Sequence, residues 1–102
     1  MLPAEKIHVP ADYIEVTPGV CGGKAHVRGT RLKVSEIARR HVYDGQSADE
    51  IVEALPQLSL AQVYAALAYY HARREETEAE LRDEDELVVT LARRYAPHLV
   101  PE

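Results

Sequence analysis

The pattern of hydrophobic and polar residues changes its period along the chain. Residues 1–12 show no periodicity and contain two prolines, so we predict an extended lead-in there. Residues 13–16 alternate in the manner of a short strand and are followed by turn residues. Residues 26–27 and 32–34 are predicted to be two further short β segments, separated by turn residues at 28–31. The start of the chain therefore predicts a small β ribbon.

From Ser35 onward the apolar residues follow helical spacing. The first helix is predicted to begin at Ser35 and to end before Gly45, because a glycine commonly follows the last turn of a helix. Its predicted apolar face consists of Ile37, Ala38, His41 and Val42. This helix precedes two others and is expected to support them.

Two capping boxes mark the starts of the next two helices. Ser47 is followed three residues later by Glu50, and Ser59 is followed three residues later by Gln62. In this motif the serine hydroxyl accepts a hydrogen bond from the third helical amide, and the Glu or Gln side chain accepts one from the serine amide. The shorter of the two helices should end before Pro56, because the residue before a proline is pushed out of the α region.

The predicted inward faces of these two helices are apolar. They consist of Ile51, Val52 and Leu55 in the shorter helix, and of Val63, Ala66, Leu67 and Tyr70 in the longer one. We expect the longer helix to run past Arg74 and the acidic stretch after it to be a hinge. A last helix then carries Leu87, Val88, Leu91, Ala92 and Tyr95 on its apolar face, and Pro97 ends it. Two capped helices joined by a short turn form a helix-turn-helix pattern.

In a helix-turn-helix, the second helix enters the major groove of DNA. The candidates for base contacts at the start of that helix are Ser59, Ala61, Gln62 and Ala65, with Tyr64 at the flank. Glutamine pairs bidentately with adenine, and an alanine side chain contacts the methyl group of thymine. Residues 41–72 contain no Lys or Arg, so phosphate contacts would have to come from the flanks. The candidates there are Lys24, Arg28, Arg31, Lys33, Arg39, Arg40, Arg73 and Arg74. Helix-turn-helix packing without DNA binding is the alternative.

The chain is large enough for one domain, with 102 residues and a formal net charge of −5. Residues 24–40 contain six Lys or Arg and one Glu, whereas residues 75–86 contain eight acidic residues and one Arg. This asymmetry indicates two different partners, and two solvated faces are the alternative. No apolar run approaches the roughly 20 residues of a membrane span. Because the start also lacks the apolar segment of a secretory signal, we expect a cytoplasmic protein.

The glycine-rich stretch at residues 19–31 does not fit a nucleotide or catalytic site. Its first glycine is one residue too close to the Gly23–Lys24 pair for a phosphate loop, and Ala25 stands where that loop needs a hydroxyl. Cys21 and His26 lack a third orienting group. The five histidines never have the spacing of a helical metal pair, and one cysteine cannot complete a zinc site. We therefore expect no enzyme activity, no cofactor and no metal, and we interpret the glycines as turn formers.

Five segments together resemble a small prokaryotic family, domain of unknown function 433. They are Gly22–Lys24, Arg28–Arg31, Gly45–Ile51, Leu55–Ser59 and Val63–Tyr70, in the family's order and spacing. The resemblance covers about residues 13–76. It implies a mainly α fold in which a trihelical, homeodomain-like helix-turn-helix follows a short β ribbon. Members of the family look like antitoxins of toxin-antitoxin pairs, encoded beside a toxin that resembles PIN-type ribonucleases. The family usually has proline at the position of Ala25 and an Ile-Pro pair near residues 32–33, which predicts a looser ribbon here.

The leading hypothesis is an antitoxin that binds operator DNA as a homodimer, represses its own operon and neutralises a PIN-like ribonuclease. Residues 13–76 would form the DNA-binding domain, with the glycine turns bringing Lys24, Arg28 and Arg31 together. Residues 77–102 would form an acidic segment and a helix for dimer or partner contact. The residues expected to bind the partner are Leu87, Val88, Leu91 and Tyr95. The alternative is a protein-interaction or dimerisation module that keeps the helix-turn-helix packing and does not bind DNA.

Overall fold

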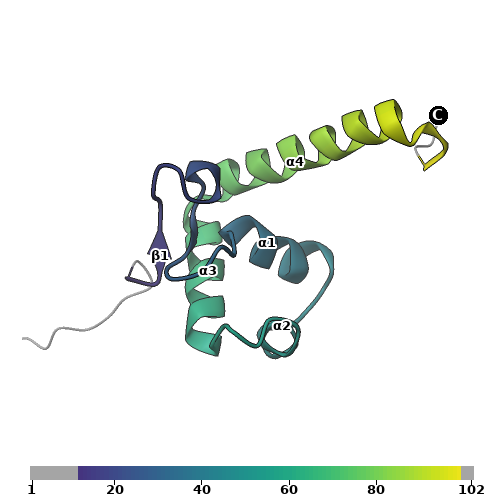
Figure 1. Ribbon diagram of the computed structural model, residues 1–102. Coiled ribbons are helices and arrows are strands. Elements are labelled where there is room, and N and C mark those ends of the chain that lie inside the picture. The colour runs from purple at the N-terminus through teal and green to yellow at the C-terminus, as the bar shows by residue number, and fades with distance from the viewer. Residues whose placement is uncertain (1–11, 100–102) are drawn as a thin grey trace, which may run out of the picture.

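The computed structural model describes residues 12–99, which form a small helical body and one long projecting helix (Figure 1). The lead-in predicted over residues 1–12 lies, except for its last residue, outside the described residues, as do residues 100–102. In chain order, the elements of the described part are β1 (Ile14–Glu15), η2 (Cys21–Gly23), β2 (His26–Val27), α1 (Val34–Ala38), η3 (Arg39–Tyr43), α2 (Ala48–Ala54), α3 (Leu60–Ala72), α4 (Arg74–Tyr95) and η4 (Pro97–Leu99). The predicted mainly α class with a short N-terminal β ribbon is confirmed.

The ribbon consists of β1 and β2, which pair antiparallel with Ile14 opposite Val27. The two strands are joined by a loop that contains η2. Gly22 and Gly23 in this loop have φ angles of 65° and 77°, which an L-amino acid with a side chain rarely adopts. The interpretation of these glycines as turn formers is therefore confirmed.

The third β segment predicted at residues 32–34 is not a strand. Lys33 makes only an isolated bridge to the ribbon, and α1 begins at Val34. The Thr30 hydroxyl closes the turn before it, donating to the Val27 carbonyl at 2.8 Å and accepting from the Leu32 amide at 3.0 Å. Because this turn redirects the backbone, the chain enters a helix where the alternating pattern predicted another strand.

α1 passes directly into η3, a wider π-helical turn. The Asp44 amide donates to the Arg39 carbonyl at 3.1 Å, a bond that spans five residues instead of four. The extra residue in such a turn rotates the following side chains away from the positions that regular α spacing gives them. His41 and Val42 are consequently exposed, Val42 at 39 %, so the predicted apolar face is wrong beyond Ala38.

α2 and α3 form the predicted helix-turn-helix, and both capping boxes are present. Ser47 Oγ accepts from the Glu50 amide while Glu50 Oε1 accepts from the Ser47 amide. Ser59 and Gln62 make the same pair of bonds at 3.2 and 2.8 Å. Each box satisfies two groups that a helix start otherwise leaves without a partner.

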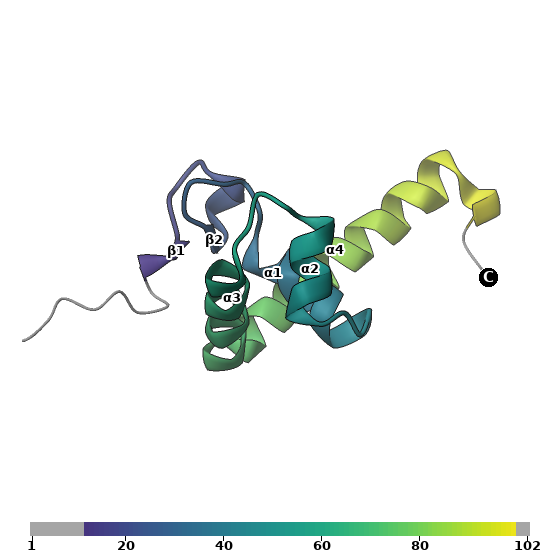
Figure 2. The same cartoon turned by 90° about the horizontal axis from the view of Figure 1, so that it is seen from below.

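The core lies between the ribbon and the first three α-helices, which pack side by side in both views (Figures 1 and 2). Its buried apolar residues are Ile14, Ala25, Val27, Val34, Ile37, Ala38, Ala48, Ile51, Leu58, Val63, Ala65, Ala66, Leu67 and Tyr70. The inward face predicted for α3 is confirmed, since all four of its residues are buried. Of the inward face predicted for the shorter helix, only Ile51 is fully buried, while Val52 and Leu55 pack at the edge of the core.

α3 ends earlier than predicted, and the acidic stretch is not a hinge. Arg73 leaves the helical region with φ −131° and ψ 46°, and a new helix, α4, begins at Arg74. The change of direction buries Thr77 and Leu81, each at 3 % exposure, because α4 then packs against α1 and α3. A straight continuation of α3 would have carried both side chains away from the body. The bend is therefore explained by tertiary packing.

Candidate functional site

The outward face of α3 is the surface that a DNA groove would meet. Tyr64 is 60 % exposed, and Ala61 is exposed beside it. Ser59 and Gln62 are at the start of the same helix, where their capping box occupies the Ser59 hydroxyl and Gln62 Oε1. Ala65 is only 2 % exposed and belongs to the core, so its predicted role in base contact is corrected. The exposed face is thus small, uncharged and centred on Tyr64.

The helix before this face carries acidic side chains. Asp49, Glu50 and Glu53 of α2 are all exposed. In helix-turn-helix complexes the first helix crosses the DNA backbone, so carboxylates here would lie near phosphates. The local charge therefore opposes DNA binding unless basic residues from the flanks compensate.

Two of the predicted phosphate ligands are instead held by α4. Lys33 Nζ contacts Glu84 Oε1 at 2.5 Å, and Arg39 donates to Asp85 at 2.9 Å and lies 3.9 Å from Glu84. Burial by itself lowers the pKa of Lys33, but the hydrogen bond and the charge of Glu84 outweigh it and raise that pKa. The two basic side chains, which flank α1 at its two ends, thus fasten α4 to this part of the body.

The other basic candidates are in different surroundings. Arg28 and Arg31 are exposed near the ribbon and form no ion pair among the described residues. Arg40 makes a long hydrogen bond of 3.4 Å to Gln46. Arg73 stacks on the ring of Tyr69 at 5.1 Å, and it lies 3.8 Å from a Glu76 oxygen. Arg74 interacts electrostatically with Glu78. Among the described residues, Arg28, Arg31 and Arg40 are therefore the predicted phosphate ligands that remain free of carboxylates.

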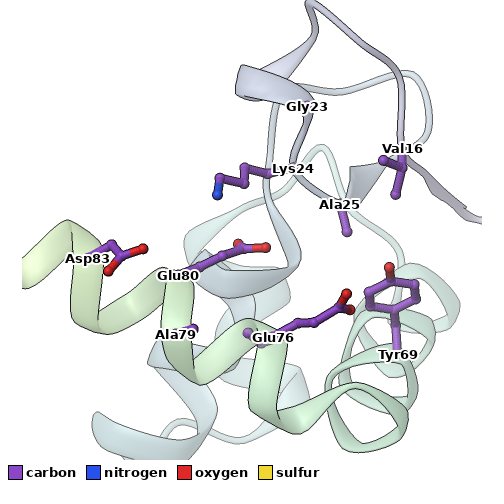
Figure 3. Close-up of a pocket in the computed structure, with 10 residues that line it drawn as sticks. Val16, Gly23, Lys24, Ala25, Tyr69, Glu76, Ala79, Glu80 and Asp83 are labelled. Atoms are coloured by element: carbon purple, nitrogen blue, oxygen red, sulfur yellow. The ribbon is translucent and has the colours of Figure 1, made fainter.

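Lys24 lies at a cavity of about 360 Å³ between the ribbon loop and α4 (Figure 3). Three carboxylates of α4, those of Glu76, Glu80 and Asp83, line the same cavity. Burial raises the pKa of Glu80, and the charge of Lys24 offsets part of this effect. The remaining lining residues are Val16, Gly23, Ala25, Tyr69, Thr77 and Ala79. Lys24 thus faces acids of its own chain.

Cys21 and His26 do not form a reactive pair. The Cys21 thiol contacts the Arg31 carbonyl oxygen at 3.4 Å. His26 is 2 % exposed, with Nδ1 3.1 Å from the Lys24 carbonyl oxygen and Nε2 3.5 Å from a Glu15 carboxylate oxygen. Both side chains therefore hold the ribbon loop. Within residues 12–99, no cluster of three or more His, Cys, Asp or Glu residues could hold a metal ion.

A cluster that no sequence pattern predicted connects η3, α3 and α4. The hydroxyl groups of Tyr43 and Tyr70 donate to the two carboxylate oxygens of Glu78, at 2.5 and 2.6 Å. These hydrogen bonds lower the pKa of Glu78 and raise the pKa of each tyrosine. No sequence signal pointed to this cluster, because the bend at Arg73 brings the three residues together.

The outer part of α4 stands clear of the body in both views (Figures 1 and 2). Leu87, Val88, Leu91 and Tyr95, here called the distal stripe, are 58, 64, 45 and 75 % exposed. They are the residues that the sequence predicts to bind a partner. The inner part of the same helix is anchored by buried Leu81 and by the ion pairs to α1. α4 is therefore an anchored arm with an uncovered apolar surface. Over the described residues, no helix is both long and apolar enough to cross a membrane.

Comparison with known proteins identifies the family of this chain. Residues 14–70 match the family described as Protein of unknown function (DUF433). The crystal structure of a DUF433 member protein from Anabaena variabilis is similar, with 33 % sequence identity and a TM-score of 0.63. That similarity covers 69 % of this chain and 68 % of the other. No curated protein matches the chain. The helix-turn-helix body described above is thus the part that the matches share, and the chain belongs to the DUF433 family.

Proposed function

We propose that this protein is the antitoxin of a toxin-antitoxin pair. It neutralises a PIN-like ribonuclease in the cytoplasm, binds operator DNA as a homodimer and represses its own operon. The observation that carries the proposal is the anchored arm of α4 with its distal stripe. A soluble protein rarely leaves a contiguous row of large apolar side chains uncovered, and such a row on a helix fits the groove of a partner.

The charges around the distal stripe favour a basic partner. Asp83, Asp85 and Glu86 are exposed just before the stripe on the same helix. A nuclease that binds RNA needs a positively charged cleft, and complementary charges increase the rate and specificity of association. Capture through α4 therefore fits an acidic apolar helix that docks beside such a cleft.

A matched pair of variants tests the capture. In Leu87→Asp with Leu91→Asp, carboxylates replace two apolar side chains of the stripe, so inhibition of the ribonuclease encoded by the neighbouring gene should weaken by at least about a hundredfold. Val89→Asp is the control. Val89 is 38 % exposed and, two residues after Leu87, lies on the opposite side of the helix. Titration of ribonuclease activity with each purified variant measures the effect. Full inhibition by the double variant, or equal losses in the double variant and the control, would exclude the stripe as the toxin site.

The DNA-binding part of the proposal rests on the helix-turn-helix geometry and on the free arginines near the ribbon. Tyr64 and Ala61 are available for groove contacts, and Arg28 and Arg31 for phosphates. A second candidate function, an interaction module that does not bind DNA, is favoured by the acidic side chains of α2 and by the absence of Lys and Arg from residues 41–72. Salt-dependent binding to the protein's own promoter, compared with random DNA, distinguishes the two functions.

A further inference from the structure

The distal stripe continues the side of α4 that faces the body. Val88 follows Leu81 by seven residues, and residues seven apart lie on nearly the same side of an α-helix. Leu81 is buried at 3 % exposure, whereas Val88 is 64 % exposed because the body ends before it. A partner that binds the distal stripe therefore lies alongside α4 and contacts the edge of the helical body.

The charges along α4 are divided between its two halves. Residues 83–86 are four consecutive acids, and Arg93 and Arg94 stand in the last turn. Two such helices packed in parallel would place acids beside acids. An antiparallel pair places the acidic segment of each copy beside the basic end of the other. The charge pattern is thus complementary to itself in one orientation only.

The spacing of residues aligns this charge pattern with the apolar stripe. Asp83, Leu87 and Arg94 are separated by four and seven residues, so they lie along one line of the helix. When Leu87 of one antiparallel helix is opposite Leu91 of another, Arg94 comes level with residue 84 of the second copy, one residue of helical rise from that copy's Asp83. A twofold axis then repeats each contact, as in any isologous dimer.

We propose that a second copy of this chain covers the distal stripe through an antiparallel α4–α4 contact centred between Leu87 and Leu91. The contact involves about three turns of each helix, so the buried area is small and the dimer is weak and dependent on concentration. This inference needs neither DNA binding nor a toxin. A ribonuclease that docks on the same leucines displaces the second copy, so toxin capture and dimerisation compete.

The test is a charge exchange, measured by sedimentation of the full chain over a range of concentrations. Arg94→Glu alone and Asp83→Arg alone each place like charges opposite each other twice per dimer, and each should raise the dimer dissociation constant by about tenfold or more. The variant with both changes restores opposite charges and should dimerise as the wild type does. Arg93→Glu is the matched control, because Arg93 points away from Leu87 on the far side of the helix.

Each outcome decides the proposal. Weakening by each single variant, restoration by the double variant and no effect of Arg93→Glu support the antiparallel contact. A wild-type chain that stays monomeric up to about millimolar concentration overturns it and leaves the stripe to the toxin. A dimer that survives Leu87→Asp with Leu91→Asp overturns it as well, since another face then holds the copies together. Circular dichroism of each variant identifies any loss of helix, and the restoring double variant excludes simple misfolding. The toxin titration uses a separate protein and a separate readout, so it can fail while this contact holds.

Discussion

At the scale of single residues, Glu78 is the most informative side chain of the molecule. It accepts hydrogen bonds from Tyr43 and Tyr70, and these lie on two different elements. Hydrogen bonds to a charged acceptor are stronger than those between neutral groups. One carboxylate thereby holds η3, α3 and the first turns of α4 in a single arrangement.

The lowered pKa of Glu78 predicts an acid-sensitive contribution to stability. A carboxylate whose pKa is lower in the folded state stabilises it above the unfolded value of 4.5, and this contribution disappears as the pH falls from 4.5 through the lowered pKa. Glu78→Gln should therefore lower the melting temperature by several degrees at pH 7, and the difference from wild type should shrink below pH 4. Thermal unfolding followed by circular dichroism measures this. Glu75→Gln is the control, since Glu75 is exposed and its side chain forms no hydrogen bond or ion pair within residues 12–99. A gap between Glu78→Gln and wild type that stays constant with pH would contradict the proposed role.

At the scale of elements, the two capping boxes define where the helix-turn-helix begins and turns. Ser59 sets the first residue of α3, and Leu58 immediately before it is buried. The next boundary, at Arg73, has no comparable local signal. Residues on both sides of it favour helix, and only the burial of Thr77 and Leu81 explains the new direction.

Removing the second cap tests its contribution. Ser59→Ala leaves the Gln62 amide without its side-chain partner and should lower the free energy of unfolding by about 1 kcal/mol. Ser59→Asn keeps an acceptor at the cap and should retain most of the stability. Urea denaturation of both variants and of wild type gives the comparison. Equal stability of the alanine and wild-type proteins would show that the box is dispensable.

At the scale of the whole molecule, charge decides which surfaces are available. α4 neutralises Lys33 and Arg39 and faces Lys24, although these three residues belong to the basic segment predicted to bind phosphates. Exposed surface ion pairs individually contribute little to stability. Here buried Leu81 and the hydrogen bonds of Glu78 hold the same helix in place as well. Much of the basic segment thus serves to position α4.

The arginines that remain free give a direct test of DNA binding. Arg28→Ala with Arg31→Ala should weaken binding to the promoter and reduce the slope of log affinity against log salt by about 2, one unit for each lost phosphate contact. Arg82→Ala with Arg93→Ala removes the same charge from exposed positions of α4 and should leave that slope unchanged. Fluorescence anisotropy at several salt concentrations measures both. Identical slopes in the two variants would favour the interaction module.

The sequence by itself determined the local features of this protein. A serine followed three residues later by Glu or Gln specifies the starts of α2 and α3, and helical spacing specifies the buried face of α3, because both depend only on near neighbours along the chain. The same local spacing marked the distal stripe. The family followed from short motifs in order, without any knowledge of packing.

Only the tertiary structure decided how these elements meet. The π turn in η3 removed His41 and Val42 from the core, and local spacing cannot register a widened turn. The burial of Ala65, the bend at Arg73 and the pairing of Lys33 with Glu84 each depend on segments far apart in sequence. Burial and ion pairing depend on which residues lie close together in space. Which basic residues stay free for a partner is therefore decided by the packing of α4 against α1.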